Sequence, residues 1–322
     1  MRLFDGHSDI LYDVTRRRLQ GEETVLQRHH MAKLQQGGIW GLTLAFWLPP
    51  AENDIWAVAA PEKVNTAAGR LEIMMEQAEK ELAQCSWLVP VRNAVEAKAT
   101  LSAGKRFAFF SLEGMEAMGE DLQTIDRWAA WGIRMAMLTW NGKNLLATGA
   151  GGDAGEGLTP LGCRAVDRME ENGILLDLSH LNEGGFWTAL DRARGPVLAS
   201  HSNCRALCDV RRNLTDQQLR AIRDHGGVVG LNTHGPFVSS VREQQTLETL
   251  ARHAAHMAEV MGVEHVACGF DYCGFMGPGN ESVTGMEDCR YSQALFHRLA
   301  EMGMHRRELE LIAGENLLRL LR

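Results

Sequence analysis

The sequence lacks a long apolar segment, an extended leader and a concentration of basic residues. No apolar run approaches the roughly 20 residues that span a bilayer. Residues 1–4, ahead of the first motif, are too few for a secretory signal. The formal charge is −8, whereas nucleic acids and anionic membranes attract clustered positive charge. We therefore expect a soluble, cytoplasmic protein with no nucleic-acid or membrane partner.

Signals for disulfides, linkers and phosphate loops are also missing. The seven cysteines are an odd number and form no C-x-x-C pair, which favours reduced thiols over a disulfide framework. No stretch rich in glycine and serine or in proline divides the chain. Residues 149–157 are rich in glycine but lack the lysine-hydroxyl ending of a P-loop. We predict one domain over residues 1–322, with residues 149–157 forming a mobile loop.

Short apolar runs recur along the chain, with longer segments of helical period between them. Continuous apolar runs are typical of parallel strands that are covered on both faces. We predict strands at residues 3–10, 39–47, 107–112, 133–138, 174–178, 196–199, 228–231 and 266–269. We predict helices at residues 60–84, 121–131, 161–172, 183–192, 215–225 and 244–261.

This alternation of strands and helices repeats about eight times, which indicates an α/β fold. We predict a (β/α)8 TIM barrel, with a doubly wound open sheet as the alternative. Two parts depart from an ideal barrel. They are an extra apolar run at residues 87–91 and a helical C-terminal tail at residues 292–322, and we interpret both as additions to the barrel.

The segment Asp5-Gly6-His7-Ser8-Asp9 places an imidazole and a carboxylate two positions apart near the start of the chain. In an extended strand, residues i and i+2 point to the same face. His7 and Asp9 would therefore both reach one metal ion if this strand ended at a cleft. Such a triplet also occurs in ordinary surface turns, so a metal site requires further ligands from elsewhere in the chain.

Four later predicted strands are each followed by a metal-compatible side chain. These side chains are Glu113 after residues 107–112, His180 after residues 174–178, His201 after residues 196–199 and Asp271 after residues 266–269. In a barrel, the carboxyl ends of the strands meet at one mouth, where active sites form. Each residue alone is also consistent with a turn or a hydrogen-bonded buried histidine. Together with the opening motif, they predict a metal site.

The donor types indicate the metal and its number. Imidazole and carboxylate ligands without thiolate suit zinc or a similar divalent ion. Five ligands are too many for one catalytic zinc that also holds water, so we predict two ions that a carboxylate bridges, with a shared hydroxide between them. A remaining carboxylate at the rim would move protons between that water and a leaving amine.

With these motifs in hand, the chain resembles the membrane (renal) dipeptidases, peptidase family M19, within the amidohydrolase-like metal-dependent hydrolases. The resemblance covers nearly the whole chain. It rests on Asp5-Gly6-His7-Ser8-Asp9, Glu113-Gly114, Gly157-Leu158-Thr159-Pro160-Leu161-Gly162, Asp177-Leu178-Ser179-His180, Ser200-His201-Ser202, Arg211-Arg212-Asn213-Leu214-Thr215-Asp216 and Gly269-Phe270-Asp271-Tyr272.

The resemblance implies a role for each candidate ligand. His7 and Asp9 would bind the first zinc, His180 and His201 would bind the second, and Glu113 would bridge the two ions. This division agrees with the chemical interpretation of the strand-end residues.

The resemblance also implies a reaction and its catalytic group. The enzyme would be a zinc-dependent dipeptidase in which a metal-bridging hydroxide attacks a dipeptide, and family members often tolerate a D-residue at the C-terminal position. Asp271 would act as the acid/base. Arg212 would receive the substrate's terminal carboxylate, which suits its planar, two-pronged donor group. The family is often dimeric, so a homodimer is possible here.

Two positions differ from the family pattern. Trp140 stands where the family usually has a histidine that helps to hold the substrate carbonyl, and an indole cannot carry positive charge. Cys273 stands where the family often has a second aspartate. These departures suggest that Asn141, Lys143 or Tyr272 assists at the carbonyl, so that Trp140, Asn141 and Tyr272 join Arg212 as candidate substrate-binding residues.

The sequence is also consistent with three alternative functions. A divergent amidohydrolase would act on N-acyl amino acids or modified peptides. A metal-binding barrel without hydrolytic activity would bind zinc and turn over no amide. A deacetylase or cyclic amidase is less well supported, because those barrels usually open with H-x-H and often use a modified lysine.

Overall fold

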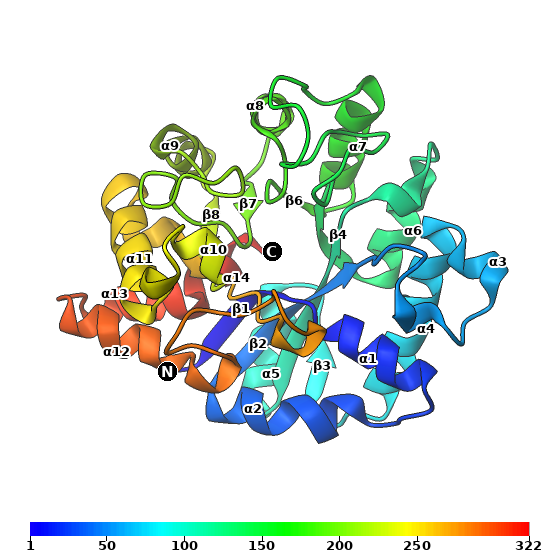
Figure 1. Ribbon diagram of the computed structural model, residues 1–322, viewed down its shortest axis with the longest axis horizontal. Helices are drawn as coiled ribbons and strands as arrows, with labels where there is room; N and C mark the ends of the chain where they lie inside the picture. The colour runs from blue at the N-terminus through cyan, green and yellow to red at the C-terminus, as the bar shows by residue number, and fades with distance from the viewer. Residues whose placement is uncertain (322) are drawn as a thin grey trace.

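The computed structural model describes residues 1–321 and contains a closed parallel barrel surrounded by helices (Figure 1). The strands are β1 (Leu3–Ser8), β2 (Ile39–Trp47), β3 (Leu88–Pro90), β4 (Arg106–Glu113), β5 (Ile133–Met137), β6 (Leu175–Asp177), β7 (Leu198–Ala199), β8 (Val228–Leu231) and β9 (Val266–Cys268). The eight predicted strands are all present, within a few residues of the expected bounds.

The barrel closes because β2 pairs with β4 as well as with β1. The closed order is β2-β1-β9-β8-β7-β6-β5-β4 and back to β2, and each of these pairings is parallel. This confirms the (β/α)8 TIM barrel and excludes the open doubly wound sheet. The predicted extra run forms β3, which pairs with β4 at residues 106–108 alone.

Helices alternate with these strands and cover the outside of the barrel (Figure 1). They are α1 (Ile10–Leu19), α2 (Met31–Gln36), α3 (Pro61–Val64), α4 (Ala67–Ala83), α5 (Ala94–Ser102), α6 (Gln123–Trp131), α7 (Pro160–Glu171), α8 (Glu183–Arg192), α9 (Asp216–Asp224), α10 (Gly235–Val238), α11 (Leu247–Met261), α12 (Gln293–Glu301), α13 (Arg306–Glu310) and α14 (Asn316–Leu320).

Two of the predicted boundaries are wrong for local reasons. The helix expected at residues 60–84 is broken into α3 and α4, because Thr66 is extended and its Oγ1 accepts a hydrogen bond from Gly69 N at 3.0 Å. A side-chain cap of this kind starts a new helix. The strand expected at residues 3–10 ends at Ser8, since Ile10 already begins α1.

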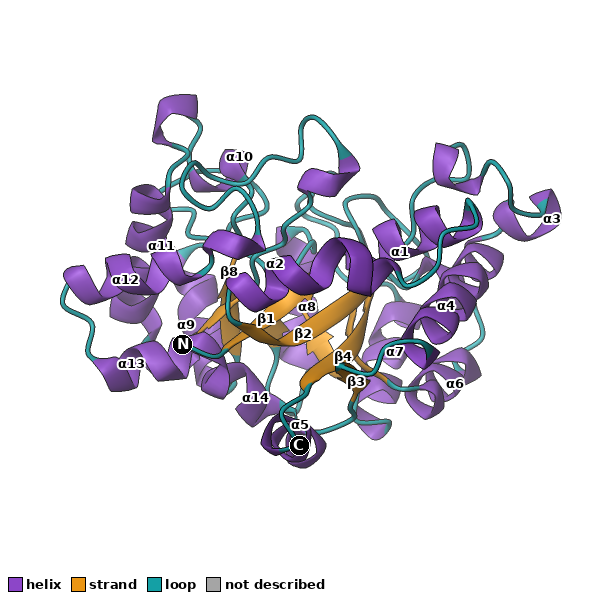
Figure 2. Cartoon of the chain, turned by 90° about the horizontal axis from the view of Figure 1, so that it is seen from below, coloured by secondary structure: helices purple, strands orange, loops and turns teal. Residues whose placement is uncertain are grey.

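The core has two layers. The larger lies between the barrel and its helices, and the smaller fills the barrel interior with Phe4, Phe107, Phe109 and Met135. Leu317 of α14 packs into this inner layer. The C-terminal tail therefore closes one end of the barrel and is more than an addition to it. Figure 2 shows α14 at that end and the long loops gathered at the other.

No helix among residues 1–321 is both long and apolar enough to cross a membrane.

Candidate metal centre

Strand alternation on β4 aims Glu113 into the barrel mouth. Phe107 and Phe109 belong to the interior layer, whereas Ala108, Phe110 and Leu112 belong to the layer beneath the helices. Because successive side chains of a strand point to opposite faces, the last residue of β4 shares the inward face of Phe109. Glu113 is 4% exposed. The sequence thus places a buried carboxylate where the strand ends.

His7 and Asp9 of the opening motif also lie at the barrel mouth, although β1 is irregular there. The β1–β2 register shifts between Asp5 and Ser8, and such irregularities re-aim side chains near active sites. His7 is fully buried, and Asp9 lies beyond the strand as the N-cap residue of α1. The two side chains do meet, but the expected explanation, that both lie on one face of a strand, is wrong.

Three more candidates follow the ends of β6, β7 and β9 within three residues. His180 and Asp271 have positive φ angles of 69° and 57°. L-residues adopt this region at some cost in free energy, and such strain tends to occur at functional sites. His201 follows β7 and is 1% exposed. The backbone therefore directs all three side chains toward the mouth.

The five predicted ligands are brought together, with Glu113 between two groups. Glu113 Oε2 lies 3.3 Å from His7 Nε2, and its Oε1 lies 3.0 Å from His180 Nε2. Asp9 Oδ1 lies 3.6 Å from His7 Nε2, and His201 Nε2 lies 2.8 Å from His180 Nε2. One carboxylate thus faces a different imidazole with each of its oxygens.

Several buried donor atoms of these ligands lack a hydrogen-bond partner within residues 1–321, which is what a site for divalent ions requires. His7 Nε2, Asp9 Oδ1 and Glu113 Oε2 are buried and have no hydrogen-bond partner among the described residues. Buried polar atoms in this state require an explanation, because native proteins usually satisfy them. Donor atoms of His7, Glu113 and His201, and separately those of His7, Asp9 and Asp271, lie within 4.8 Å of one another. Nitrogen and oxygen donors in such clusters suit zinc.

Electrostatics also favour a cation at this position. Burial, followed by the charge of Asp9, raises the pKa of Glu113 to about 8 against the opposing effect of His7. Burial opposes protonation of His7, but Glu113 and Asp9 outweigh it and hold its pKa well above the usual value. Burial lowers the pKa values of His180 and His201 well below the usual value, which keeps both imidazoles neutral, as metal ligation requires.

Hydrogen bonds orient the second pair of imidazoles. Asn141 Oδ1 lies 2.9 Å from His180 Nδ1, and Ser200 Oγ lies 2.7 Å from His201 Nδ1. Asp177 Oδ1 accepts bonds from the backbone N–H groups of Ser179 and Ser200, each at 3.0 Å. Partners of this kind fix the ring orientation of metal-binding histidines. Asn141 therefore supports His180 in addition to lining the cavity.

A cavity of about 280 Å³ opens above these donors. Its lining residues are Asp9, Trp47, Glu113, Trp140, Asn141, His180, Arg212, His234, Phe237, Asp271, Cys273, Met276 and Asn280. Trp140 is 37% exposed and packs against Trp47, with ring centroids 5.4 Å apart. The cavity lining therefore includes an aromatic, apolar pair as well as charged side chains.

Arg212 provides the cationic group of the cavity. It is 9% exposed, its Nη1 donates to Ser202 Oγ at 3.4 Å, and its Nη2 donates to the carbonyl oxygen of His201 at 3.2 Å. Its Nε has no partner among residues 1–321. Burial lowers its pKa to about 10, so the guanidinium stays charged at neutral pH and has donor capacity left for an anion.

Two residues expected near the substrate lie elsewhere. Tyr272 is buried, its hydroxyl lies 3.0 Å from Ser292 Oγ, and it does not line the cavity. Lys143 is mostly exposed and forms an ion pair with Glu156 at 2.8 Å. Neither residue lines the cavity, so neither would contact a substrate bound there.

Sequence reasoning missed His234, Asn232 and the contacts of Cys273. Asn232 Nδ2 donates to Asp271 Oδ2 at 3.0 Å, and Cys273 Sγ lies 3.0 Å from Asp271 Oδ1 and 3.3 Å from Asp9 Oδ2. Asn232 and His234 follow predicted strand 228–231 by one and three residues, whereas the other candidates follow their predicted strands by one or two. Applying the rule to this strand would have found Asn232, and extending it to three residues would have found His234.

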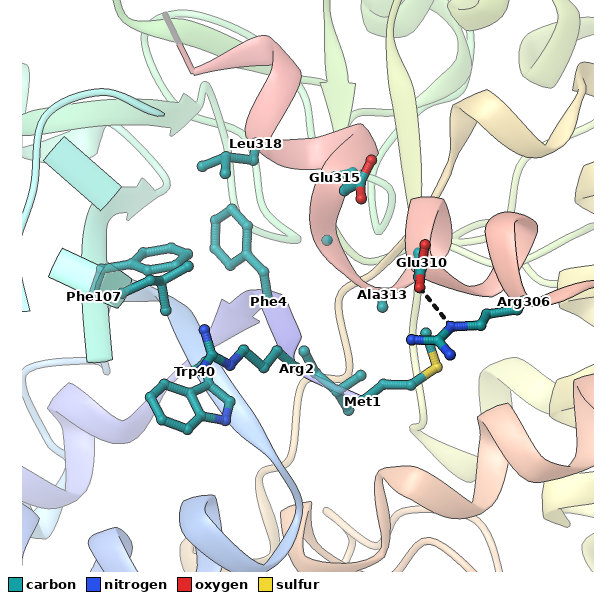
Figure 3. A pocket seen from close by; sticks show the side chains of 13 residues that line it. Met1, Arg2, Phe4, Trp40, Phe107, Arg306, Glu310, Ala313, Glu315 and Leu318 are labelled. Atoms are coloured by element: carbon teal, nitrogen blue, oxygen red, sulfur yellow. Dashed lines mark hydrogen bonds and ion pairs between the residues drawn. The ribbon is translucent and has the colours of Figure 1, made fainter. Parts of the chain in front are cut away.

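A second cavity, of about 600 Å³, lies at the closed end of the barrel (Figure 3). Phe4, Phe107 and Leu318 form its apolar wall, and the Arg2 guanidinium lies 4.4 Å from the Trp40 ring centroid. Both of the donor clusters described above belong to the opposite mouth. The smaller cavity is therefore the candidate site.

A parallel barrel with clustered imidazole and carboxylate donors at its mouth has the architecture of a metal-dependent hydrolase. A model of the membrane dipeptidase family, peptidase family M19, matches residues 1–322. The chain belongs to this family and is a metallopeptidase of the dipeptidase type.

The chain is also similar to individual proteins and to solved structures. The chain is 36% identical over 218 residues to an uncharacterized protein in the pqqA 5′ region of Klebsiella pneumoniae, covering 65% of this chain and 78% of that protein. It is 33% identical over 216 residues to an uncharacterized dipeptidase of Schizosaccharomyces pombe, covering 66% of this chain and 52% of that protein. A Rhodobacter sphaeroides metallo peptidase, solved with a phosphinate mimic of the dipeptide L-Ala-D-Ala, superposes with a TM-score of 0.86 at 26% identity, covering 100% of this chain and 98% of that one.

Proposed function

We propose that the protein is a zinc-dependent dipeptidase with two zinc ions and that it accepts a D-residue at the C-terminal position of a small dipeptide. The observation that carries this proposal is the two-sided contact of Glu113 with His7 and His180. His7 and Asp9 would hold one ion, and His180 and His201 the other. When bound, the ions would supply Lewis acidity, which lowers the pKa of water and polarises a carbonyl.

Asp271 would move the proton. Its Oδ1 faces the donor cluster, 3.9 Å from His7 Nε2, while its Oδ2 accepts a hydrogen bond from Asn232. Asp271 Oδ1 would take a proton from the attacking water and pass it to the amine of the leaving residue. Asn232 and Cys273 would keep the carboxylate in place for both transfers.

Arg212 would bind the carboxylate of the C-terminal residue. It lines the same cavity as Asp271, and its buried Nε has no partner among the described residues. A charge-assisted bond to a carboxylate in a buried setting would fix the orientation of the substrate. Trp47 and Trp140, which line the same cavity, would exclude water from the scissile bond.

The preference for a C-terminal D-residue draws support from the Rhodobacter sphaeroides structure, whose bound molecule mimics L-Ala-D-Ala. A cavity of about 280 Å³ suits a substrate of that small size. The test is hydrolysis by the zinc-reconstituted protein of L-Ala-D-Ala, L-Ala-L-Ala and N-acetyl-D-alanine. Turnover of L-Ala-D-Ala at a higher kcat/KM than the others supports the proposal. Turnover of none of the three would refute it.

Trp140 favours a second candidate function, the hydrolysis of N-acyl amino acids. Its indole packs against Trp47 at the cavity wall and offers apolar surface where the family usually presents a histidine. Such a wall suits an acyl chain better than a charged amino terminus. In the same substrate panel, this candidate predicts that N-acetyl-D-alanine is hydrolysed faster than either dipeptide.

Trp140→His tests which substrate class this wall serves. We expect kcat for L-Ala-D-Ala to rise by about tenfold, because an imidazole can carry positive charge near the carbonyl whereas an indole cannot, and one stabilising contact there contributes on the order of 10²–10³ in optimised sites. Steady-state kinetics with both substrate classes measures the effect. Trp140→Phe is the matched control, since it keeps the apolar wall and adds no donor. A lower dipeptide kcat in Trp140→His would show that the indole itself contributes to dipeptide turnover.

A further inference from the structure

His234 occupies a fixed position at the cavity wall. Its backbone N–H donates to Asn232 Oδ1 at 2.7 Å, and the same asparagine donates to Asp271 Oδ2 through its Nδ2. Asn232 is fully buried. One buried side chain therefore holds both the segment that carries His234 and the carboxylate that we propose as the acid/base.

The imidazole of His234 and the guanidinium of Arg212 pack on the same aromatic ring. The His234 and Phe237 ring centroids lie 4.7 Å apart in an edge-on arrangement, and Arg212 Cζ lies 5.4 Å from the Phe237 centroid. All three residues line the cavity. No hydrogen bond joins a ring nitrogen of His234 to any of residues 1–321, so the imidazole of this lining residue has a donor free for a ligand.

We propose that His234 donates a hydrogen bond to the substrate's C-terminal carboxylate beside Arg212 and so selects for substrates with a free carboxylate. This inference rests on the proposed dipeptidase function. A carboxylate offers about four lone-pair sites, and Arg212 already uses two of its nitrogens on Ser202 and on the carbonyl oxygen of His201. A second donor on the same side of the cavity completes the recognition.

The chemistry of His234 is compatible with this role. Burial lowers its pKa, Arg212 lowers it further, and Asp271 and Glu281 oppose these effects. A neutral imidazole has one N–H donor, which is enough for one carboxylate oxygen. Its place in the lining puts an imidazole in this cavity even though the family's usual histidine is absent.

His234→Phe tests the inference, because phenylalanine keeps the ring contact with Phe237 and removes the donor. We expect KM for L-Ala-D-Ala to rise about 10-fold to 100-fold, the range for one hydrogen bond to a charged group, with kcat within about threefold of wild type. The C-terminal amide of L-Ala-D-Ala lacks the carboxylate, so its kcat/KM should change little. The preference for the acid over the amide, measured as the ratio of the two kcat/KM values, should therefore fall by the same factor. His234→Gln restores a side-chain donor and should recover part of the loss. His297→Phe, at an exposed position on α12, is the matched control.

Direct binding separates this inference from the proposed function. Calorimetric titration with a phosphinate mimic of L-Ala-D-Ala should show about tenfold weaker binding to His234→Phe than to wild type, whether or not the wild type turns over dipeptides. Equal affinity of the two proteins for the mimic would overturn the role of His234. A fall in kcat at unchanged KM would place His234 at the scissile carbonyl instead. An equal loss of kcat/KM for the acid and the amide substrates would make the role of His234 structural. Each of these last two results would also reject the inference.

Discussion

Glu113→Gln is expected to lower kcat/KM for the best substrate by about 10³-fold or more. A metal ion that polarises a carbonyl contributes several kcal/mol, and each 1.4 kcal/mol is a factor of ten in rate. Glutamine has one oxygen acceptor in place of two, and its NH₂ group would face one of the imidazoles that Glu113 now contacts at 3.3 Å and 3.0 Å. The variant would therefore bind at most one ion well. Steady-state kinetics and metal analysis of the same preparation measure both effects.

Glu116→Gln is the matched control for this variant. Glu116 lies three residues further along the same connection, outside the cavity that holds the donors. We expect its kcat/KM to stay within about twofold of wild type, as for substitutions away from a site. A Glu113→Gln protein that keeps a tenth of wild-type activity and its full metal content would contradict the bridging role of Glu113.

Asp271→Asn is expected to reduce kcat by about 10²-fold to 10⁴-fold, the range for the loss of a general acid or base. Asparagine matches aspartate in size and keeps an oxygen that can accept from Asn232, which now donates to Asp271 Oδ2 at 3.0 Å. Metal content should therefore be retained. Steady-state rates and metal analysis of the same preparation make the measurement.

Asp288→Asn is the control for the loss of a carboxylate. Asp288 forms an ion pair with Arg290 and does not line the cavity, so its kcat should match that of wild type. If Asp271→Asn kept wild-type kcat, another group would have to transfer the proton.

The barrel was predictable because its strands are continuous apolar runs. Residues 39–47 and 228–231 form strands with the predicted bounds, since strands covered on both faces need apolar residues at every position. The packing of α14 was not predictable in the same way. Leu317 contacts the barrel interior from the far end of the chain, and a helix of five residues carries too little periodicity to reveal what it packs against.

The site was predictable where a single rule applied, namely a polar side chain within one or two residues of the end of a strand. That rule found Glu113 and His201, because barrel topology brings strand ends together whatever their separation in the sequence. It did not give the position of Asp9, since the register shift within β1 and the start of α1 depend on packing. Tyr272 was misplaced for a related reason. Its neighbour Asp271 has a positive φ angle, which turns the chain so that the phenol packs inward.

The family assignment narrows the functions that the sequence left open. Membership of the membrane dipeptidase family over residues 1–322 supports a metal-dependent hydrolase and leaves no support for a deacetylase or cyclic amidase. Retention of the five candidate ligands and of Asp271 argues against an inactive metal-binding barrel. The substrate panel distinguishes the two amide hydrolases that remain.

The zinc content of the reconstituted protein tests the two-ion centre most directly. The apo-protein is dialysed against zinc and freed of loosely bound metal. Mass spectrometry then gives the number of zinc ions per chain. We expect two zinc ions per chain in the wild type and no more than one in Glu113→Gln, because Glu113 contacts both groups of ligands. One ion or none in the wild type, at saturating zinc, would contradict the proposal that Glu113 bridges a pair of metals.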